Sequence, residues 1–146
     1  MPASELIALI EKHADGLTQA AVADLIMNPR TPSFRAVPRD AAAERVAALY
    51  QNLAGWLAEH DDNAVRAAYE DWGRTRFHQR IPISEIIYCV LVAKGQLRQY
   101  AREHGLAELQ AVDGTMAEFF DRALYYLVRG YEMQAASPPR PGGLLA

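Results

Sequence analysis

The sequence predicts an all-α fold, a compact bundle of six helices, and three features of the chain support this class. Apolar residues recur at three-to-four-residue intervals nearly everywhere, and no segment shows the alternation typical of a strand. Prolines fall at the joints of the periodic segments, and these joints are short. The length of 146 residues is that of one ordinary domain. We therefore expect one helical domain with a single core.

The N-terminal part of the chain predicts two helices. The first runs from Ser4, a favourable N-cap residue, to Asp15, with Gly16 as its C-terminal stop. The second begins at Thr18 and must end near Asn28, because two prolines follow.

The middle of the chain predicts a loop and two further helices. Residues 28–38 hold three prolines and no sustained periodicity, so they form a loop that Phe34 anchors on the body. A helix then runs from Asp40 to Glu59. The acidic turn 61–63 caps the next helix, which extends to about Phe77.

Two long helices complete the domain. The first runs from Pro82 to His104, with Gly105 as its stop, and its segment Ile86–Ala93 is apolar on almost every side. Such a helix is typical of a central position between several neighbours. The last helix spans about Leu109 to Gln134.

The domain therefore covers residues 1–136, and the Pro- and Gly-rich residues 137–146 read as a flexible linker or tail. Six helices with short joints imply a compact helical bundle or a globin-like stack.

Composition and charge limit the function classes. Hydrophobic residues make up 51% of the chain and charged residues 23%, which is typical of a globular protein. The formal net charge of −3 gives no electrostatic reason to bind nucleic acid or an anionic membrane. No signal peptide is recognisable, and Ile86–Ala93 is far shorter than the roughly 20 residues of a membrane span. With Cys89 as the only cysteine, no intramolecular disulfide can form, so we expect a cytoplasmic protein.

Catalytic and metal chemistry find little support in the residue patterns. Cys89 lies in the most apolar helix, where burial keeps a thiol inert, and neither a Gly-rich phosphate loop nor a G-x-S-x-G elbow is present. Three histidines, His13, His60 and His104, fall at predicted helix ends, where a cation suits the helix dipole. The adjacent residues 59–62 cannot easily converge on one ion, so we expect no metal site.

Basic residues gather around the start of the long apolar helix, and two interpretations remain open. They form either a solvated face with partial salt bridging or a site for an acidic partner or phosphorylated ligand. No aromatic interleaving of the kind that stacks bases accompanies them, so nucleic acid is not expected. The residues are Arg66, Arg74, Arg76, Arg80, Lys94, Arg98 and Arg102.

The joint Trp72–Glu85 carries a family resemblance. A Gly73-Arg74-x-Arg76 stretch, a short break and an Ile-Pro-Ile-Ser-Glu helix start resemble the RsbRD N-terminal family, most distinctively over Trp72–Tyr100. This family is the non-haem globin sensor domain of RsbR-type stressosome proteins and of some bacterial signalling proteins. The resemblance implies a globin-like fold and a non-catalytic regulatory role in stress-response signalling, through ligand or protein binding and dimerisation.

The same joint is also similar to the proximal region of globin-coupled sensors, which bind haem. This similarity implies His78 as the iron ligand, with Ile81 and Ile83 below the ring. Those sensors usually carry a polar distal residue on an early helix, and residues 20–27 contain no tyrosine or histidine. Tyr50, on a later helix, is the alternative candidate for this polar distal residue. Haem is therefore the alternative, and no cofactor is the expectation.

Four residues of this region are our candidates for ligand binding: Trp72, Arg76, His78 and Tyr88. A second alternative is a small helical enzyme in which His78 works with Glu70 or Asp71. This reading requires a deep polar pocket that joins the histidine to a carboxylate, which the sequence does not predict.

The last helix predicts a homodimer. Its apolar stripe is wider than one core needs, and Tyr125 and Tyr126 point about 100° apart on a helix. Surplus tyrosine surface is typical of interfaces, so we expect Phe120, Tyr125 and Tyr126 at the dimer contact. The alternative is that this helix is central and covered by its own neighbours.

Overall fold

The computed structural model describes residues 2–105 and 109–137 and confirms the all-α class. Within these residues it contains five α-helices, one 3₁₀ helix and no strand. The elements are α1 (Pro2–Met27), η1 (Pro32–Arg35), α2 (Arg39–Glu59), α3 (Asp62–His78), α4 (Ile83–Glu103) and α5 (Leu109–Ala136). Of the predicted tail, Ser137 follows α5 and residues 138–146 lie outside the described part.

The described helices number five because α1 joins the two helices predicted at the N-terminus. Gly16 does not end a helix. The chain instead kinks at His13, whose φ of −115° and ψ of 18° are not helical. Gly16 has a packing role, because a Cβ built on it would lie 2.8 Å from the hydroxyl oxygen of Tyr100 in α4. The glycine that looks like a stop in the sequence leaves space for the Tyr100 hydroxyl beside α1.

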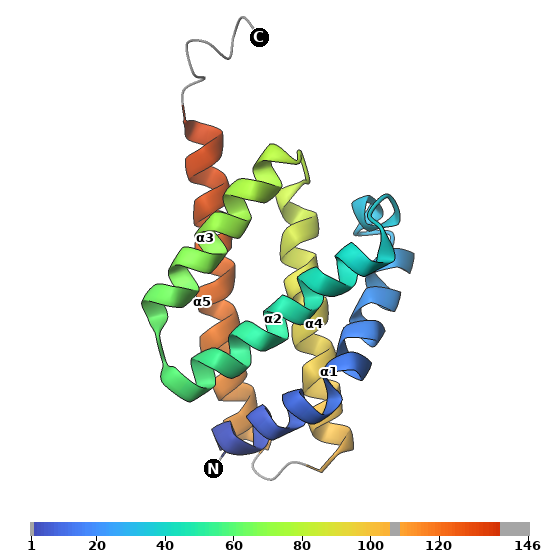
Figure 1. The fold of residues 1–146 in the computed structure, drawn as a ribbon, viewed down its shortest axis with the longest axis vertical. Coiled ribbons are helices and arrows are strands. Elements are labelled where there is room, and N and C mark those ends of the chain that lie inside the picture. The colour runs from blue at the N-terminus through green and yellow to red at the C-terminus, as the bar shows by residue number, and fades with distance from the viewer. Residues whose placement is uncertain (1, 106–108, 138–146) are drawn as a thin grey trace, which may run out of the picture.

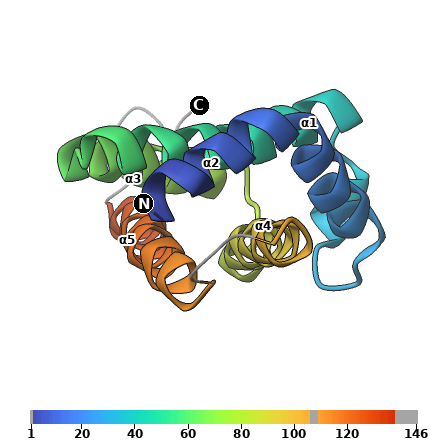
Figure 2. The same ribbon diagram turned by 90° about the horizontal axis from the view of Figure 1, so that it is seen from below.

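The helices form two layers. Figure 1 shows α2 and α3 diverging as a V from their joint, with α4 and α5 behind them. Figure 2 shows α2, α3 and the first part of α1 along one side and α4 with α5 along the other, while the second part of α1 descends beside α4. The outer side of the α4–α5 layer therefore has no helix over it.

The core lies between the two layers and is apolar. Helix α4 contacts α1, α2, α3 and α5, as its apolar sequence predicts. The expectation of apolar packing all round is wrong on one side, because Leu91 is 43% exposed. None of the described helices is both long and apolar enough to cross a membrane.

Helices α3 and α5 make the most extensive contact in the molecule, and two glycines allow it. A Cβ built on Gly73 would meet the backbone of Leu127 and lie 2.8 Å from the backbone nitrogen of Tyr131. A Cβ built on Gly130 would lie 2.7 Å from the Cα of Glu70. Side chains at either position would force the helices apart, so the glycine pair fixes α3 against α5.

Candidate ligand-binding groove

The opposite side of α3 faces a groove instead of a helix backbone. Helices α2 and α3 touch each other little, and between them runs a hollow of about 380 Å³, within the range of small-molecule sites. Its lining residues are Glu44, Arg45, Ala48, Asn52, Ala68, Asp71, Trp72, Thr75 and Arg76. The sequence sets this up locally, since Ala68, Trp72 and Thr75 recur at helical spacing on one face of α3.

Trp72 and Arg76 form a stacked pair on the α3 wall. They lie four residues apart, and the guanidinium carbon of Arg76 is 5.4 Å from the Trp72 ring centre, within cation–π range. The indole nitrogen Nε1 of Trp72 is buried, and no described residue accepts a hydrogen bond from it. A buried donor without an acceptor is costly, so it requires an explanation.

Arg45 faces the same groove from α2 and acts on Arg76 electrostatically. Burial and, to a smaller extent, the nearby charge of Arg45 together lower the pKa of Arg76 to about 10. Arg76 donates a hydrogen bond to Oε1 of Gln79 over 2.8 Å. Within the described chain neither arginine has a carboxylate within 4.0 Å, so two like charges share this wall without a neutralising partner.

The floor behind the pair is apolar and closed. Phe34, Ile81, Ile86 and Cys89 meet Arg45, Trp72 and Arg76 around a space of only about 10 Å³. That volume is at most one water molecule. Cys89 is buried, as the sequence predicts, and burial raises the pKa of its thiol to about 12 although both arginines act in the opposite direction.

A polar clamp holds Phe34 at this floor. The carboxylate of Glu85 is only 4% exposed and accepts hydrogen bonds from the backbone nitrogen of Ser33 (2.7 Å) and from its hydroxyl (2.8 Å). This bond pair ties η1 to the first turn of α4. Phe34 is itself buried, so its predicted anchoring role is confirmed, and Glu85 holds the segment that carries it.

The structure brings together two of the four predicted ligand residues. Trp72 and Arg76 share the groove, whereas His78 is exposed and lines a separate hollow with Phe77, Arg80, Pro82 and Tyr131. Tyr88 lies elsewhere, with the guanidinium of Arg30 5.5 Å from its ring centre. His78 and Tyr88 therefore do not line this groove, and their role in ligand binding stays a prediction.

Sequence reasoning missed Arg45, Ser33 and Glu85 as parts of this site. Arg45 lies on a different helix from Arg76, and they become neighbours only because α2 and α3 fold back on each other as a V. The sequence shows that Glu85 is negatively charged, but it does not reveal the hydrogen-bond partner, because Ser33 lies far away in the chain.

The residues of the two alternatives are not assembled into sites. Tyr50, the distal substitute, is buried and donates its hydroxyl to the carbonyl oxygen of Ala93 over 2.8 Å. Glu70 pairs with Arg66 at 3.2 Å, and Asp71 lies 3.9 Å from Arg74. At about 1.5 Å of rise per residue, these carboxylates lie roughly 10–12 Å along α3 from His78.

The acidic cluster and some of the basic residues have structural partners. Among the described residues no three His, Cys, Asp or Glu side chains could hold a metal ion. Asp61 caps α3 by accepting from the backbone nitrogen of Ala64, and Asp62 accepts from Nε1 of Trp56. Arg98 pairs with Asp113 at 3.1 Å, so part of the basic run is a solvated face with salt bridges.

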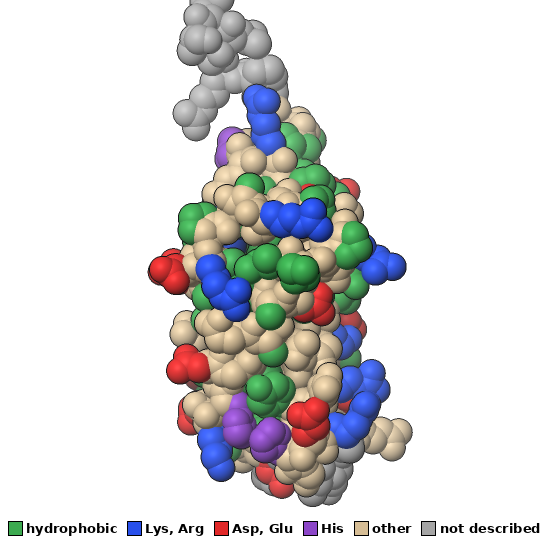
Figure 3. Space-filling view, turned by 90° about the vertical axis from the view of Figure 1, so that its right-hand side faces the viewer, with side chains coloured by type: hydrophobic (Ala, Val, Ile, Leu, Met, Phe, Trp, Pro, Cys, Tyr) green, Lys and Arg blue, Asp and Glu red, His purple; other side chains and the backbone are tan. Residues whose placement is uncertain are grey.

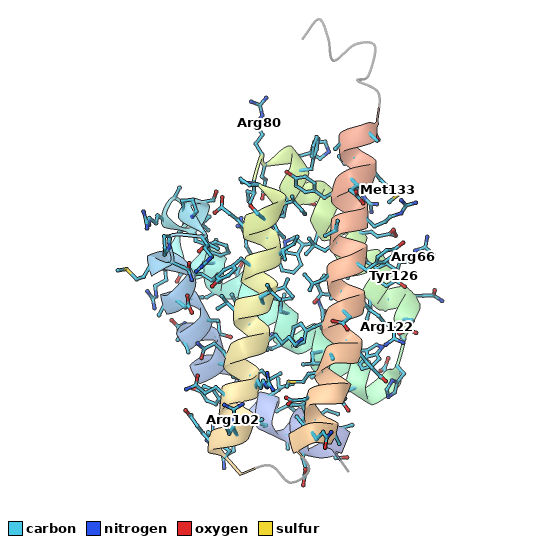
Figure 4. The ribbon with its side chains drawn as sticks, turned by 180° about the vertical axis from the view of Figure 1, so that it is seen from behind. Arg66, Arg80, Arg102, Arg122, Tyr126 and Met133 are labelled. Carbon is cyan, nitrogen blue, oxygen red and sulfur yellow. The ribbon has the colours of Figure 1, made fainter. Side chains whose placement is uncertain are left out.

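The predicted interface residues differ in exposure. Phe120 is fully buried beside Phe119, so it belongs to the core and is corrected as an interface residue. Tyr125 is 63% exposed, and Tyr126 is half-buried. Figure 4 shows Tyr126 in a row with Arg122 and Met133 along α5, on the side where α3 lies.

A histidine pair marks the far end of the α1–α4 surface. The rings of His13 and His104 lie 4.2 Å apart between centres, beside Tyr100, and Figure 3 shows two histidines side by side on this face. Desolvation lowers the pKa of His13, and the neighbouring His104 and Lys12 act in the same direction. His104 and His60 end α4 and α2, as predicted, whereas His13 lies at the kink.

No family model, no curated protein and no solved structure matches this chain. The function proposed below therefore rests on the residues and on the geometry of the groove.

Proposed function

We propose that this protein is a non-catalytic regulatory sensor domain that binds a ligand in the α2–α3 groove and pairs with a second copy of itself. The observation that carries the ligand-binding part is the stacked Trp72–Arg76 wall, whose buried indole nitrogen has no acceptor among the described residues. A ligand that accepts this hydrogen bond would remove the cost of the buried donor.

The shape of the groove supports binding without catalysis. Its walls supply donors and an aromatic face, but His78, the residue best suited to acid–base work, lies outside it. The resemblance of Trp72–Tyr100 to the RsbRD N-terminal family adds a globin-like architecture and bacterial stress signalling to the proposal. A cytoplasmic location belongs to the same proposal.

The pairing surface is the outer side of α4 and α5. Leu91 on α4 and Tyr125 on α5 are two of the three large hydrophobic side chains that are exposed within the described residues. Half-buried Ile87, Leu124 and Val128 extend the apolar surface on the same two helices. A twofold pair would cover this surface with its own copy.

A substitution that fills the groove with a large side chain tests the ligand-binding part of the proposal. Ala68 and Ala67 are both exposed on α3, but only Ala68 lines the groove. A library of small metabolites is screened by thermal shift on wild type, Ala68→Phe and Ala67→Phe. We expect compounds that raise the melting temperature of wild type and Ala67→Phe but not of Ala68→Phe. The groove is the wrong site if Ala68→Phe responds like wild type.

The mass in solution tests the pairing. Light scattering at micromolar concentration should give twice the 16.2 kDa of one chain. Tyr125→Glu should yield the single-chain mass with an unchanged helical circular dichroism spectrum. Met27→Glu, at an exposed hydrophobic position on α1, should leave the dimer intact. A single-chain mass for wild type would end the dimer proposal.

The haem alternative requires a separate titration. Hemin added to the protein should give no sharp Soret band, because the His78 ring is exposed at the end of α3. A stoichiometric band that disappears in His78→Ala would replace the proposal by a haem sensor.

A further inference from the structure

Two guanidinium groups, those of Arg45 and Arg76, line the groove from α2 and α3. The indole N–H of Trp72, which also lines it, is a buried donor without an acceptor among the described residues. Within the described residues, no carboxylate lies within 4.0 Å of either guanidinium. The only side-chain acceptor recorded for the three is Oε1 of Gln79, which takes one bond from Arg76.

The placement of the two charges is unfavourable for the unoccupied protein. Arg76 is half-buried and stacked on Trp72, so it has less water than a surface arginine, and Arg45 adds a like charge across the groove. The other two half-buried arginines of the described residues each lie within 4.0 Å of a carboxylate: Arg74 near Asp71 and Arg122 near Asp62. Arg45 and Arg76 are the half-buried arginines of this part of the chain that have no such partner.

An anion between the two helices would relieve the repulsion between the guanidinium groups. Guanidinium groups bind carboxylate and phosphate oxygens through two parallel hydrogen bonds, and charge-assisted bonds are about twice as strong as neutral ones. We infer that the α2–α3 groove binds a small oxyanion, a carboxylate or a phosphate ester, through Arg45 and Arg76 beside the ring of Trp72. This inference rests on the proposed ligand-binding function of the same groove.

The rim of the groove limits the charge and size of the anion. Glu44 and Asp71 line the groove and are exposed, and Asp71 lies 3.9 Å from Arg74 instead of contacting Arg76. Their negative charges repel a polyanion, so the inference is confined to a ligand with a single oxyanion group. The hollow of about 380 Å³ suits a small molecule of this kind.

Matched probe pairs test the charge requirement. Wild-type protein is titrated with benzoate against benzamide, with phenyl phosphate against phenol, and with inorganic phosphate alone. We expect the anionic member of at least one pair to bind and its neutral partner to bind at least about tenfold more weakly, since hydrogen bonds to charged groups contribute that much. Equal binding of the two members would overturn the oxyanion inference and leave the proposed function standing. Absence of binding by every probe would overturn the inference, whereas the metabolite screen on Ala68→Phe decides the proposed function separately.

Arginine variants locate the anion. Arg76→Gln and Arg45→Gln should each weaken binding about tenfold or more. Arg80→Gln removes the same charge from an exposed residue that points away from the groove at the end of the molecule (Figure 4), and it should bind like wild type. Asp71→Asn should strengthen binding. Equal weakening in Arg80→Gln would mean that the anion senses net charge only, and the inference would fail.

The two indole protons give an internal control. Nε1 of Trp56 already donates to Asp62 over 2.8 Å, whereas Nε1 of Trp72 has no acceptor in the described chain. In a ¹⁵N–¹H spectrum the bound anion should shift the Trp72 indole signal and leave that of Trp56 in place. A bound anion that leaves the Trp72 signal unmoved would overturn its assignment to this groove.

Discussion

The two sides of α3 are built on opposite principles. Toward α5, Gly73 and Gly130 have no side chains, so the two backbones meet. Toward α2, Trp72 and Arg76 line a charged hollow. The comparison teaches that packing and recognition are separated by only about a third of a turn of one helix. Stability should therefore depend on the first side and binding on the second.

The largest expected effect is on the reactivity of Cys89 in the floor of the groove, because this floor separates the open hollow from the closed core. Burial raises the pKa of Cys89 from 9.0 to about 12, which lowers its thiolate fraction near neutral pH about a thousandfold. A thiol reagent at pH 8 should label native protein slowly and urea-unfolded protein at once. Rapid stoichiometric labelling of native protein would show that the floor is open.

The same thiol gives a pH dependence with a defined sign. Its pKa is higher in the folded chain, so the unfolded chain releases the proton first as pH rises. The free energy of unfolding should therefore fall between about pH 9 and pH 12 in wild type. Cys89→Ala should lack this component of the loss.

A substitution at the contact between Gly73 and α5 tests the packing side of α3. Gly73→Ala places a methyl group against the backbone of α5 and should lower the free energy of unfolding by about 3 kcal/mol, measured by urea denaturation. Gly95→Ala is the matched control, because nothing lies within 4 Å of its Cβ position on α4. It should raise stability by about 0.5–1 kcal/mol through helix propensity. Equal effects of the two substitutions would refute the close contact.

Loss of the Glu85–Ser33 hydrogen bonds beneath the groove should have an intermediate effect on the free energy of unfolding. Glu85→Ala removes two hydrogen bonds to Ser33 and leaves its backbone nitrogen unsatisfied, so it should cost about 2 kcal/mol. Hydrogen exchange at Ser33 should also speed up. Glu103→Ala, at an exposed position on the same helix, should cost little. A cost under about 0.5 kcal/mol for Glu85→Ala would show that η1 does not depend on the clamp.

The groove arginine has the smallest expected effect on stability. Arg76→Met loses its cation–π contact with Trp72, worth about 0.5–1 kcal/mol, but it also removes the repulsion from Arg45. The free energy of unfolding should change by less than about 1 kcal/mol. A larger loss would show that Arg76 supports the fold, and the division between the two sides of α3 would not hold.

Local signals predict most of the fold and only part of the groove. Prolines and the Asp61 cap determine where helices begin and end, so these features can be read from short segments. The continuity of α1 cannot, because Gly16 is explained only by Tyr100 on another helix. Trp72 and Arg76 share one helix and were predicted together. Arg45 reaches them only through the crossing of α2 and α3, which no local pattern encodes.

The glycine pair also decides which wall of the groove can move. With backbone against backbone at Gly73 and Gly130, α3 cannot slide or tilt without carrying α5 with it. Helix α2 has no such restraint against α3, since their mutual contacts are few. A ligand wider than the groove should therefore widen the gap between α2 and α3 and leave the contact between α3 and α5 unchanged. Spin labels across α2 and α3 should then report a longer distance on binding, and labels across α3 and α5 should not.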